Sequence, residues 1–94
     1  MWLKGIAQYD GGLAHYNMQQ ENEGIYQANL TQFDGKPGHQ PPQRIILIRG
    51  RKGWTGNIKD KKLIRDLGSI IDVRTRGRLF SQVLQENMSH FRKL

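Results

Sequence analysis

The stretch Leu63-Ile64-Arg65-Asp66-Leu67-Gly68-Ser69-Ile70-Ile71 predicts an amphipathic helix. Its apolar residues fall at positions i, i+1, i+4, i+7 and i+8, so a helix gathers them into one stripe. Asp60 precedes the stripe as the expected N-cap, with Asn57 as the alternative. Gly68 costs a helix about 1 kcal/mol relative to alanine. We attribute its presence to close packing of the helix against a sheet.

A second apolar pattern follows and predicts a second helix. Gly77 is expected to break the first helix within the segment 73–78. The second helix would carry its apolar residues on one side, and these are Leu79, Phe80, Val83, Leu84, Met88 and Phe91.

The residues before the first helix are typical of strands separated by turns. Tyr26, Ala28 and Leu30 alternate with polar residues, which is the period of a strand with one buried face. Asp10-Gly11-Gly12 predicts a hairpin turn with positive φ angles. The candidate strands are 2–9, 13–18, 25–33, 43–49 and 54–58, with 19–24 as a loop and 36–42 as an irregular connection.

Two local patterns add to this interpretation. Gln-aromatic-Asp-Gly occurs at 8–11 and again at 32–35, and we interpret each copy as a strand that ends in a tight turn. The run Ile-Ile-Leu-Ile at 45–48 would place apolar side chains on both faces of a strand. Such a strand is either covered on both sides, or covered on one side and paired with a second copy of the chain on the other.

Strands followed by helices favour an α+β architecture. We expect the 94 residues to form one domain, 1–94. A small antiparallel β-sheet of about four strands would occupy the N-terminal two-thirds, and two C-terminal α-helices would pack on it.

The composition excludes several kinds of site. With no cysteine, the chain has no disulfides, zinc–thiolate sites, iron–sulfur clusters or cysteine nucleophiles. The longest apolar run, 45–48, is too short to span a bilayer, and no apolar signal-peptide segment follows Met1. We expect a cytoplasmic protein without a membrane partner.

Positive charge is concentrated in the second half of the chain. Fifteen basic and eight acidic residues give a net charge of +7. Residues 1–43 contribute two bases and four acids, whereas residues 44–94 contribute thirteen bases and four acids. This asymmetry favours a surface that faces a polyanion.

The candidate nucleic-acid-binding residues form three groups. They are Arg49, Arg51, Lys52 and Trp54 on a predicted hairpin; Lys59, Lys61 and Lys62 at the start of the first helix; and Arg74, Arg76 and Arg78 between the two helices. Arginine and lysine bind phosphate, and an exposed indole can stack on a base. The alternatives are that Trp54 caps a small core, that the lysines are simply solvated, and that the last group pairs with Asp66 and Asp72.

Enzymatic chemistry has little support in the sequence. His15, His39 and His90 lack metal-ligand spacing, and no carboxylate lies near them in the chain. We therefore expect no enzyme, no metal and no cofactor. A histidine that the fold brought beside a carboxylate in a cleft would reopen the question.

Two functional hypotheses follow. The first is a non-enzymatic nucleic-acid-binding domain, for DNA or RNA, that contacts phosphates through its basic surface. The alternative is a protein-interaction or assembly module, in which an apolar sheet face left uncovered forms a homodimer or binds another protein.

Overall fold

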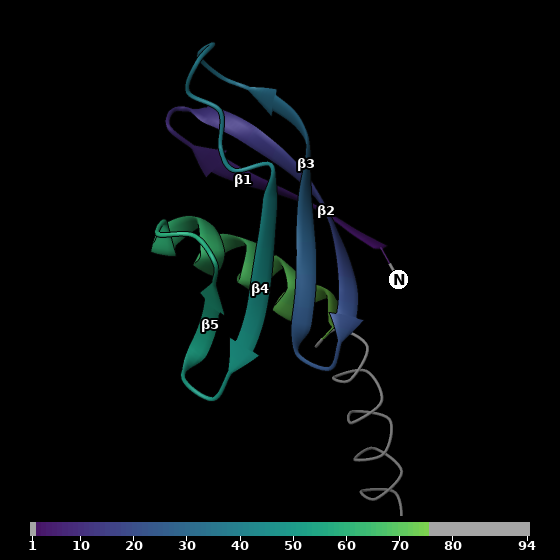
Figure 1. The fold of residues 1–94 in the computed structure, drawn as a ribbon. Helices are drawn as coiled ribbons and strands as arrows, with labels where there is room; N and C mark the ends of the chain where they lie inside the picture. The colour runs from purple at the N-terminus through teal and green to yellow at the C-terminus, as the bar shows by residue number, and fades with distance from the viewer. Residues whose placement is uncertain (1, 76–94) are drawn as a thin grey trace, which may run out of the picture.

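The computed structural model describes residues 2–75, which form an antiparallel sheet with a helix across one face (Figure 1). Each strand pairs with the next along the chain, in the order β1-β2-β3-β4-β5. The strands are β1 (Trp2–Tyr9), β2 (Gly12–Asn22), β3 (Ile25–Asp34), β4 (Arg44–Gly50) and β5 (Gly53–Gly56). A helix then occupies residues 61–75 and crosses behind β4 and β3 in Figure 1.

The expected sheet with helical cover is confirmed, and two details are corrected. The sheet has five strands rather than about four. The segment 19–24 was expected to be a loop, but β2 continues to Asn22 and pairs with Ile25. The side chains of residues 19–22 are polar and do not alternate with apolar ones, because this part of β2 extends beyond the area that the helix covers. The second predicted helix, like Arg76 and Arg78, lies outside the described residues.

The predicted turn between β1 and β2 is confirmed. Asp10 has a φ of 47° and Gly11 a φ of 78°, the two positive values that a two-residue type I′ hairpin requires. The repeated aromatic-Asp-Gly pattern also has a structural role. Tyr9 and Phe33, one from each copy, meet edge to face with ring centroids 6.1 Å apart. The two copies therefore mark the ends of β1 and β3, on either side of the start of β2. The second copy ends its strand in a bend at Gly35 rather than in the expected tight turn.

The start of the helix is fixed as expected. The backbone N–H of Leu63 donates to Asp60 Oδ1 at 3.0 Å, so Asp60 is the N-cap. Asn57, the alternative, accepts a hydrogen bond from the backbone N–H of Ile46 instead, at 2.9 Å. It thereby ties the end of β5 to β4.

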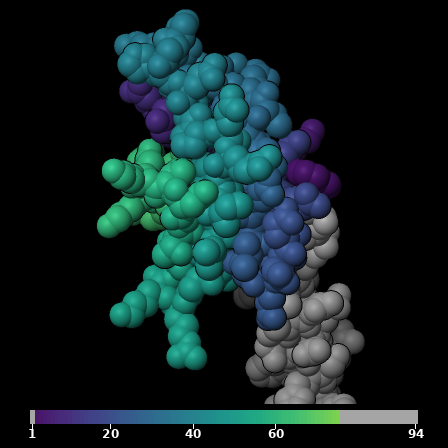
Figure 2. All heavy atoms as spheres, viewed as in Figure 1, coloured from purple at the N-terminus to yellow at the C-terminus, as the bar shows by residue number. Residues whose placement is uncertain are grey.

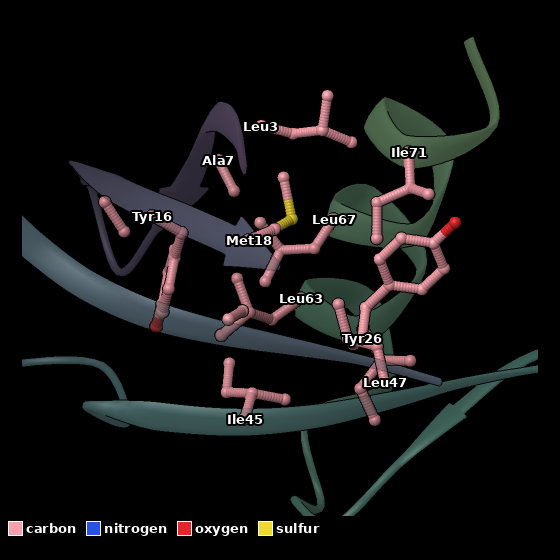
Figure 3. Packing of buried hydrophobic residues seen from close by; sticks show 13 residues of the cluster. Leu3, Ala7, Tyr16, Met18, Tyr26, Ile45, Leu47, Leu63, Leu67 and Ile71 are labelled. Carbon is pink, nitrogen blue, oxygen red and sulfur yellow. The ribbon is translucent and has the colours of Figure 1, made fainter. Parts of the chain in front are cut away.

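The core lies between the helix and one face of the sheet, which we call the covered face (Figure 3). Its buried residues are Leu3, Ala7, Ala14, Tyr16, Met18, Tyr26, Ala28, Ile45, Leu47, Leu63, Ile64, Leu67 and Ile71. Strands β1 to β4 contribute alternate residues, as their pleat requires, and the half-buried Trp54 of β5 packs against them. The remaining residues of each strand form the opposite face, which we call the open face.

Strand β4 shows how the two faces differ. Ile45 and Leu47 are fully buried, whereas Ile46 is only half-buried and Ile48 is exposed. Of the two arrangements expected for this apolar run, the described residues show a strand that is covered on one side.

Tyr16 leads to a prediction about alkaline stability. Its side chain is buried, and its hydroxyl donates to the carbonyl oxygen of Pro42 at 2.7 Å. Burial raises the pKa of Tyr16 well above its ordinary value of 10.0. The folded state therefore favours the neutral phenol, and this stabilisation is complete below about pH 10 and is lost as the pH rises beyond it.

Tyr16→Phe should lower the free energy of unfolding by about 1 kcal/mol at neutral pH, because the Pro42 carbonyl loses its donor. Above pH 10, the free energy of unfolding should also fall less steeply in this variant than in the wild type. Urea unfolding at several pH values measures both effects, with Tyr9→Phe as the matched control. An unchanged alkaline profile in Tyr16→Phe would contradict the assignment.

Candidate nucleic-acid interface

A groove runs between β5, at the edge of the sheet, and the first turns of the helix. Its volume is about 690 Å³. Four basic side chains line it, and these are Lys52, Lys59, Lys61 and Arg65. Its apolar wall comes from Trp54, Ile58 and Ile64. We call this feature the β5 groove.

Local structure explains why the four cations converge. Lys52 lies in the two-residue turn between Gly50 and Gly53, which pair with each other across the β4–β5 hairpin. Lys61 and Arg65 are four residues apart, so they lie on one side of the helix. Figure 2 shows long side chains of the hairpin turn and of the segment that opens the helix projecting on the left of the view.

Gly56 allows the helix and β4 to lie close to the end of β5. A Cβ atom at this position would lie 2.9 Å from the Ile46 carbonyl oxygen and 3.0 Å from Ile64 Cδ1. No residue other than glycine fits there without movement of the helix or of β4. The close approach of the helix brings its first turns alongside β5.

The charge of the β5 groove is unbalanced. No carboxylate lines it among residues 2–75. Asp60, which stands between two of the lysines in sequence, directs its side chain to the helix N-terminus. Asp66 accepts a hydrogen bond from Lys62 at 3.2 Å, away from the groove. The four groove cations therefore add their potentials at one place.

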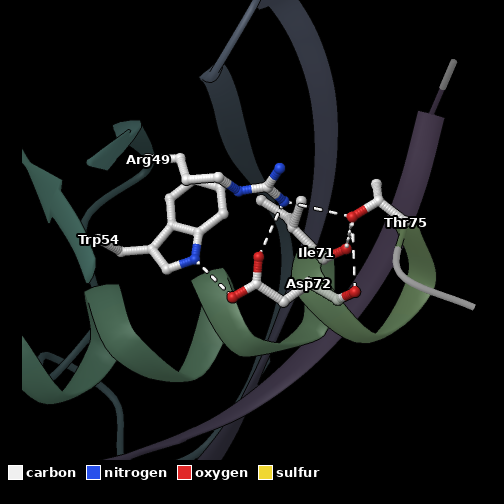
Figure 4. A network of polar contacts seen from close by, with 5 residues as sticks. All are labelled: Arg49, Trp54, Ile71, Asp72 and Thr75. Atoms are coloured by element: carbon white, nitrogen blue, oxygen red, sulfur yellow. Dashed lines mark hydrogen bonds and ion pairs between the residues drawn. The ribbon is translucent and has the colours of Figure 1, made fainter. Parts of the chain in front are cut away.

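Trp54 is held by a polar network rather than presented to solvent (Figure 4). Its indole Nε1–H donates to Asp72 Oδ2 at 3.0 Å. The other carboxylate oxygen of Asp72 lies 2.8 Å from Arg49 Nη2. The guanidinium carbon of Arg49 lies 5.0 Å from the centre of the indole ring, and Nη2 also donates to Thr75 Oγ1 at 3.2 Å.

The surroundings of Trp54 favour the core-capping alternative. Gly68 lies directly against the indole, because a Cβ atom on Gly68 would lie 2.3 Å from its Cγ. Tyr26 meets the ring edge to face, with centroids 5.7 Å apart. The predicted close packing of Gly68 is thereby confirmed. With Arg49 and Gly68 against the ring, Trp54 supports the groove wall and presents no free face on which a base could stack.

The other predicted cations are dispersed. Arg49 is engaged by Asp72, and Lys62 pairs with Asp66. Arg51 is exposed at the hairpin turn, next to the groove. Arg74 is exposed on the helix nine residues after Arg65, which corresponds to about half a revolution and places it on the opposite side.

The ion-pairing alternative for the third basic group can be examined only at Arg74, because Arg76 and Arg78 lie outside the described residues. Within residues 2–75 Arg74 pairs with neither Asp66 nor Asp72. In the structure Asp72 pairs with Arg49 from β4, and Asp66 pairs with Lys62 from the preceding turn. Arg49 of β4 contacts Asp72 because the helix lies across β4 and β5.

Arg65 is the groove residue that the sequence analysis missed. It lies within the apolar stripe used to predict the helix and belongs to none of the three basic groups. Its position four residues after Lys61 was the available signal, since that spacing puts two helical residues on one face.

Two histidines lie beside carboxylates. His15 Nε2 is 3.2 Å from Asp34 Oδ2, and His39 Nδ1 is 3.1 Å from Asp10 Oδ2. The hydrogen bond from Gln32, followed by the contact with His15, holds the pKa of Asp34 below its ordinary value. Both aspartates and His39 are largely exposed. His15 also lines a hollow of about 800 Å³ with Lys4, Thr31 and Arg74, so the fold does bring one histidine beside a carboxylate in a cleft. Within residues 2–75 neither ring bonds to a hydroxyl, so neither pair shows the contact between base and nucleophile that nucleophilic catalysis uses.

Within residues 2–75 no three histidine, aspartate or glutamate side chains gather closely enough to hold a metal ion. Over the same residues, no helix combines the length and apolar character needed to cross a bilayer.

Comparisons of the chain with protein-family models, curated proteins and solved structures found no match. The geometry of the site therefore has to carry the functional proposal.

Proposed function

We propose that this domain binds nucleic acid without catalysis and that the β5 groove is its contact surface. The observation that carries the proposal is the convergence of Lys52, Lys59, Lys61 and Arg65 on one groove with no carboxylate among the described residues that line it. Phosphates are the natural partners of such an array, because lysine and arginine both donate charge-assisted hydrogen bonds to them.

The shape of the groove supports an extended ligand. Two cations follow one another along the helix, and a third comes from the turn that leads into β5. A phosphate backbone laid along β5 would meet them in succession. The described groove offers no free aromatic face for base stacking, so we expect binding that depends on charge and discriminates little between sequences.

Fluorescence anisotropy with labelled single-stranded and duplex oligonucleotides tests the proposal. The double variant Lys61→Gln/Arg65→Gln should weaken binding about tenfold, which corresponds to about 1.4 kcal/mol. The slope of log K against log salt should become shallower by about 1.4 for a single strand, since each lost phosphate contact contributes about 0.7.

Lys4→Gln/Lys36→Gln is the matched control, because it removes the same charge from exposed positions outside the groove that were not candidate binding residues. It should leave the affinity within about twofold of the wild type, because distant charges are screened by salt and have only a small effect. Equal weakening by the two double variants would assign binding to net charge rather than to the groove. Absence of binding at low salt would refute the proposal.

A further inference from the structure

We propose that the open face of the sheet binds the open face of a second copy of this chain. The surface is distinct from the β5 groove and does not depend on nucleic-acid binding. Its character comes from large apolar side chains that the described part of the chain leaves in solvent.

Four of these side chains lie on three different strands of the open face. Trp2 is 58% exposed and Ile6 55% exposed on β1, Leu13 is 44% exposed on β2, and Ile48 is 44% exposed on β4. Ile48 pairs across strands with Ile25, which is half-buried, and this pair extends the apolar surface onto β3. Single exposed apolar residues are ordinary, but several on one sheet face mark an interaction surface.

The area is sufficient for a stable pair. Five strands spaced about 4.8 Å apart, with a mean length of eight residues, have a plan area of roughly 600 Å². Two such faces would bury roughly 1,200 Å² in plan, and more in accessible surface because side chains make the face uneven. Specific interfaces begin at about this size. Two sheets packed face to face are also a standard arrangement of a hydrophobic layer.

The charges on the open face favour a second copy over a polyanion. Lys4 and Arg44 are balanced there by Glu21 and Asp34. Gln27 lies between two of these groups, with one amide atom 2.9 Å from Glu21 Oε1 and the other 3.1 Å from Arg44 Nε. The charges that the strands place on this face therefore balance, although the chain carries +7 overall. Arg74 of the helix adds positive charge only at the β1 edge, where it lines a hollow with Lys4 and Ile6. Little electrostatic repulsion between copies is therefore expected over the rest of the face.

The centre of the open face is also chemically self-complementary. Asn17 pairs with Asn29, and Gln19 with Gln27, in the β2–β3 ladder. An amide side chain both donates and accepts hydrogen bonds, so identical rows can satisfy one another across a twofold interface. The open face, with apolar residues at its periphery and amides at its centre, is therefore complementary to the open face of a second copy.

Sedimentation velocity of the whole chain across the micromolar range tests the proposal. The wild type should approach twice its 10.9 kDa mass. Ile6→Glu and Ile48→Glu should each raise the dimer dissociation constant at least tenfold, because a carboxylate would be buried without a partner. Lys62→Glu is the control, since it introduces a carboxylate at an exposed helix position that pairs with Asp66 and lies away from the open face, and it should leave the dimer intact.

Circular dichroism confirms that each variant folds, and Trp2 provides a second readout. Quenching of tryptophan fluorescence by acrylamide should decrease as the wild type associates, and should not change with concentration in Ile48→Glu. A wild-type monomer at every concentration would overturn the proposal. So would equal disruption by Lys62→Glu and Ile48→Glu, or loss of oligonucleotide binding in Ile48→Glu with the mass unchanged.

Discussion

Gly68→Ala should lower the free energy of unfolding by about 2 kcal/mol, although the same change at an ordinary helical position stabilises a protein by about 1 kcal/mol. The effect on the free energy of unfolding has the opposite sign at Gly68 because of Trp54. The added methyl carbon would lie between 2.3 and 2.7 Å from three indole atoms. The indole has little freedom to retreat, because Tyr26 meets its edge and Asp72 binds its N–H.

Thermal or urea unfolding measures this effect, and Ser69→Ala is the matched control. Ser69 is exposed and adjacent in the same helix, so its replacement should be neutral or slightly stabilising. A double-mutant cycle identifies the cause: in a Trp54→Leu background, Gly68→Ala should no longer destabilise the domain. Destabilisation by Gly68→Ala of the same size in both backgrounds would refute the proposed contact.

This position also shows how far the sequence could predict the fold. A glycine within an apolar stripe indicated close packing, and the spacing of the stripe indicated the helix. Both depend on local periodicity, which the sequence carries directly. The identity of the residue packed against Gly68 depends on which strand passes beneath the helix, and no pattern in the sequence specifies that.

The strands illustrate the same limit. The alternation in 25–33 and the Asp-Gly turn were sufficient to predict β3 and the β1–β2 hairpin. The end of β2 was missed because Gln19–Asn22 has no buried face, so its strand structure depends on hydrogen bonding to β3 rather than on its own side chains.

The candidate site was predictable only in part. Lys52, Lys59 and Lys61 were singled out from their charge and their neighbours, and all three line the β5 groove. Arg65 was missed, and the pairing of Arg49 with Asp72 could not be foreseen, because each depends on the angle at which the helix crosses the sheet. Charge clustering in sequence indicates that a basic surface exists, whereas the crossing angle decides which cations share it.

Asp72→Ala should lower the free energy of unfolding by about 2 kcal/mol, because one carboxylate serves two partners from the sheet. The Trp54 N–H would lose its only acceptor in the described part of the chain. This group is partly buried, so most of the cost arises there. The pair with Arg49 adds less, about 0.5 kcal/mol, because both side chains are partly exposed to water.

Asp72→Asn separates the two contributions. An asparagine can still accept the indole hydrogen bond through its side-chain oxygen, but it no longer attracts Arg49 by charge. Its cost should therefore be less than half that of Asp72→Ala. Asp66→Ala is the control, since it removes an exposed pair with Lys62 four residues away and should cost at most about 0.5 kcal/mol. If Asp72→Ala cost no more than Asp66→Ala, the network would not anchor the helix on β4 and β5, and the walls of the β5 groove would need another support.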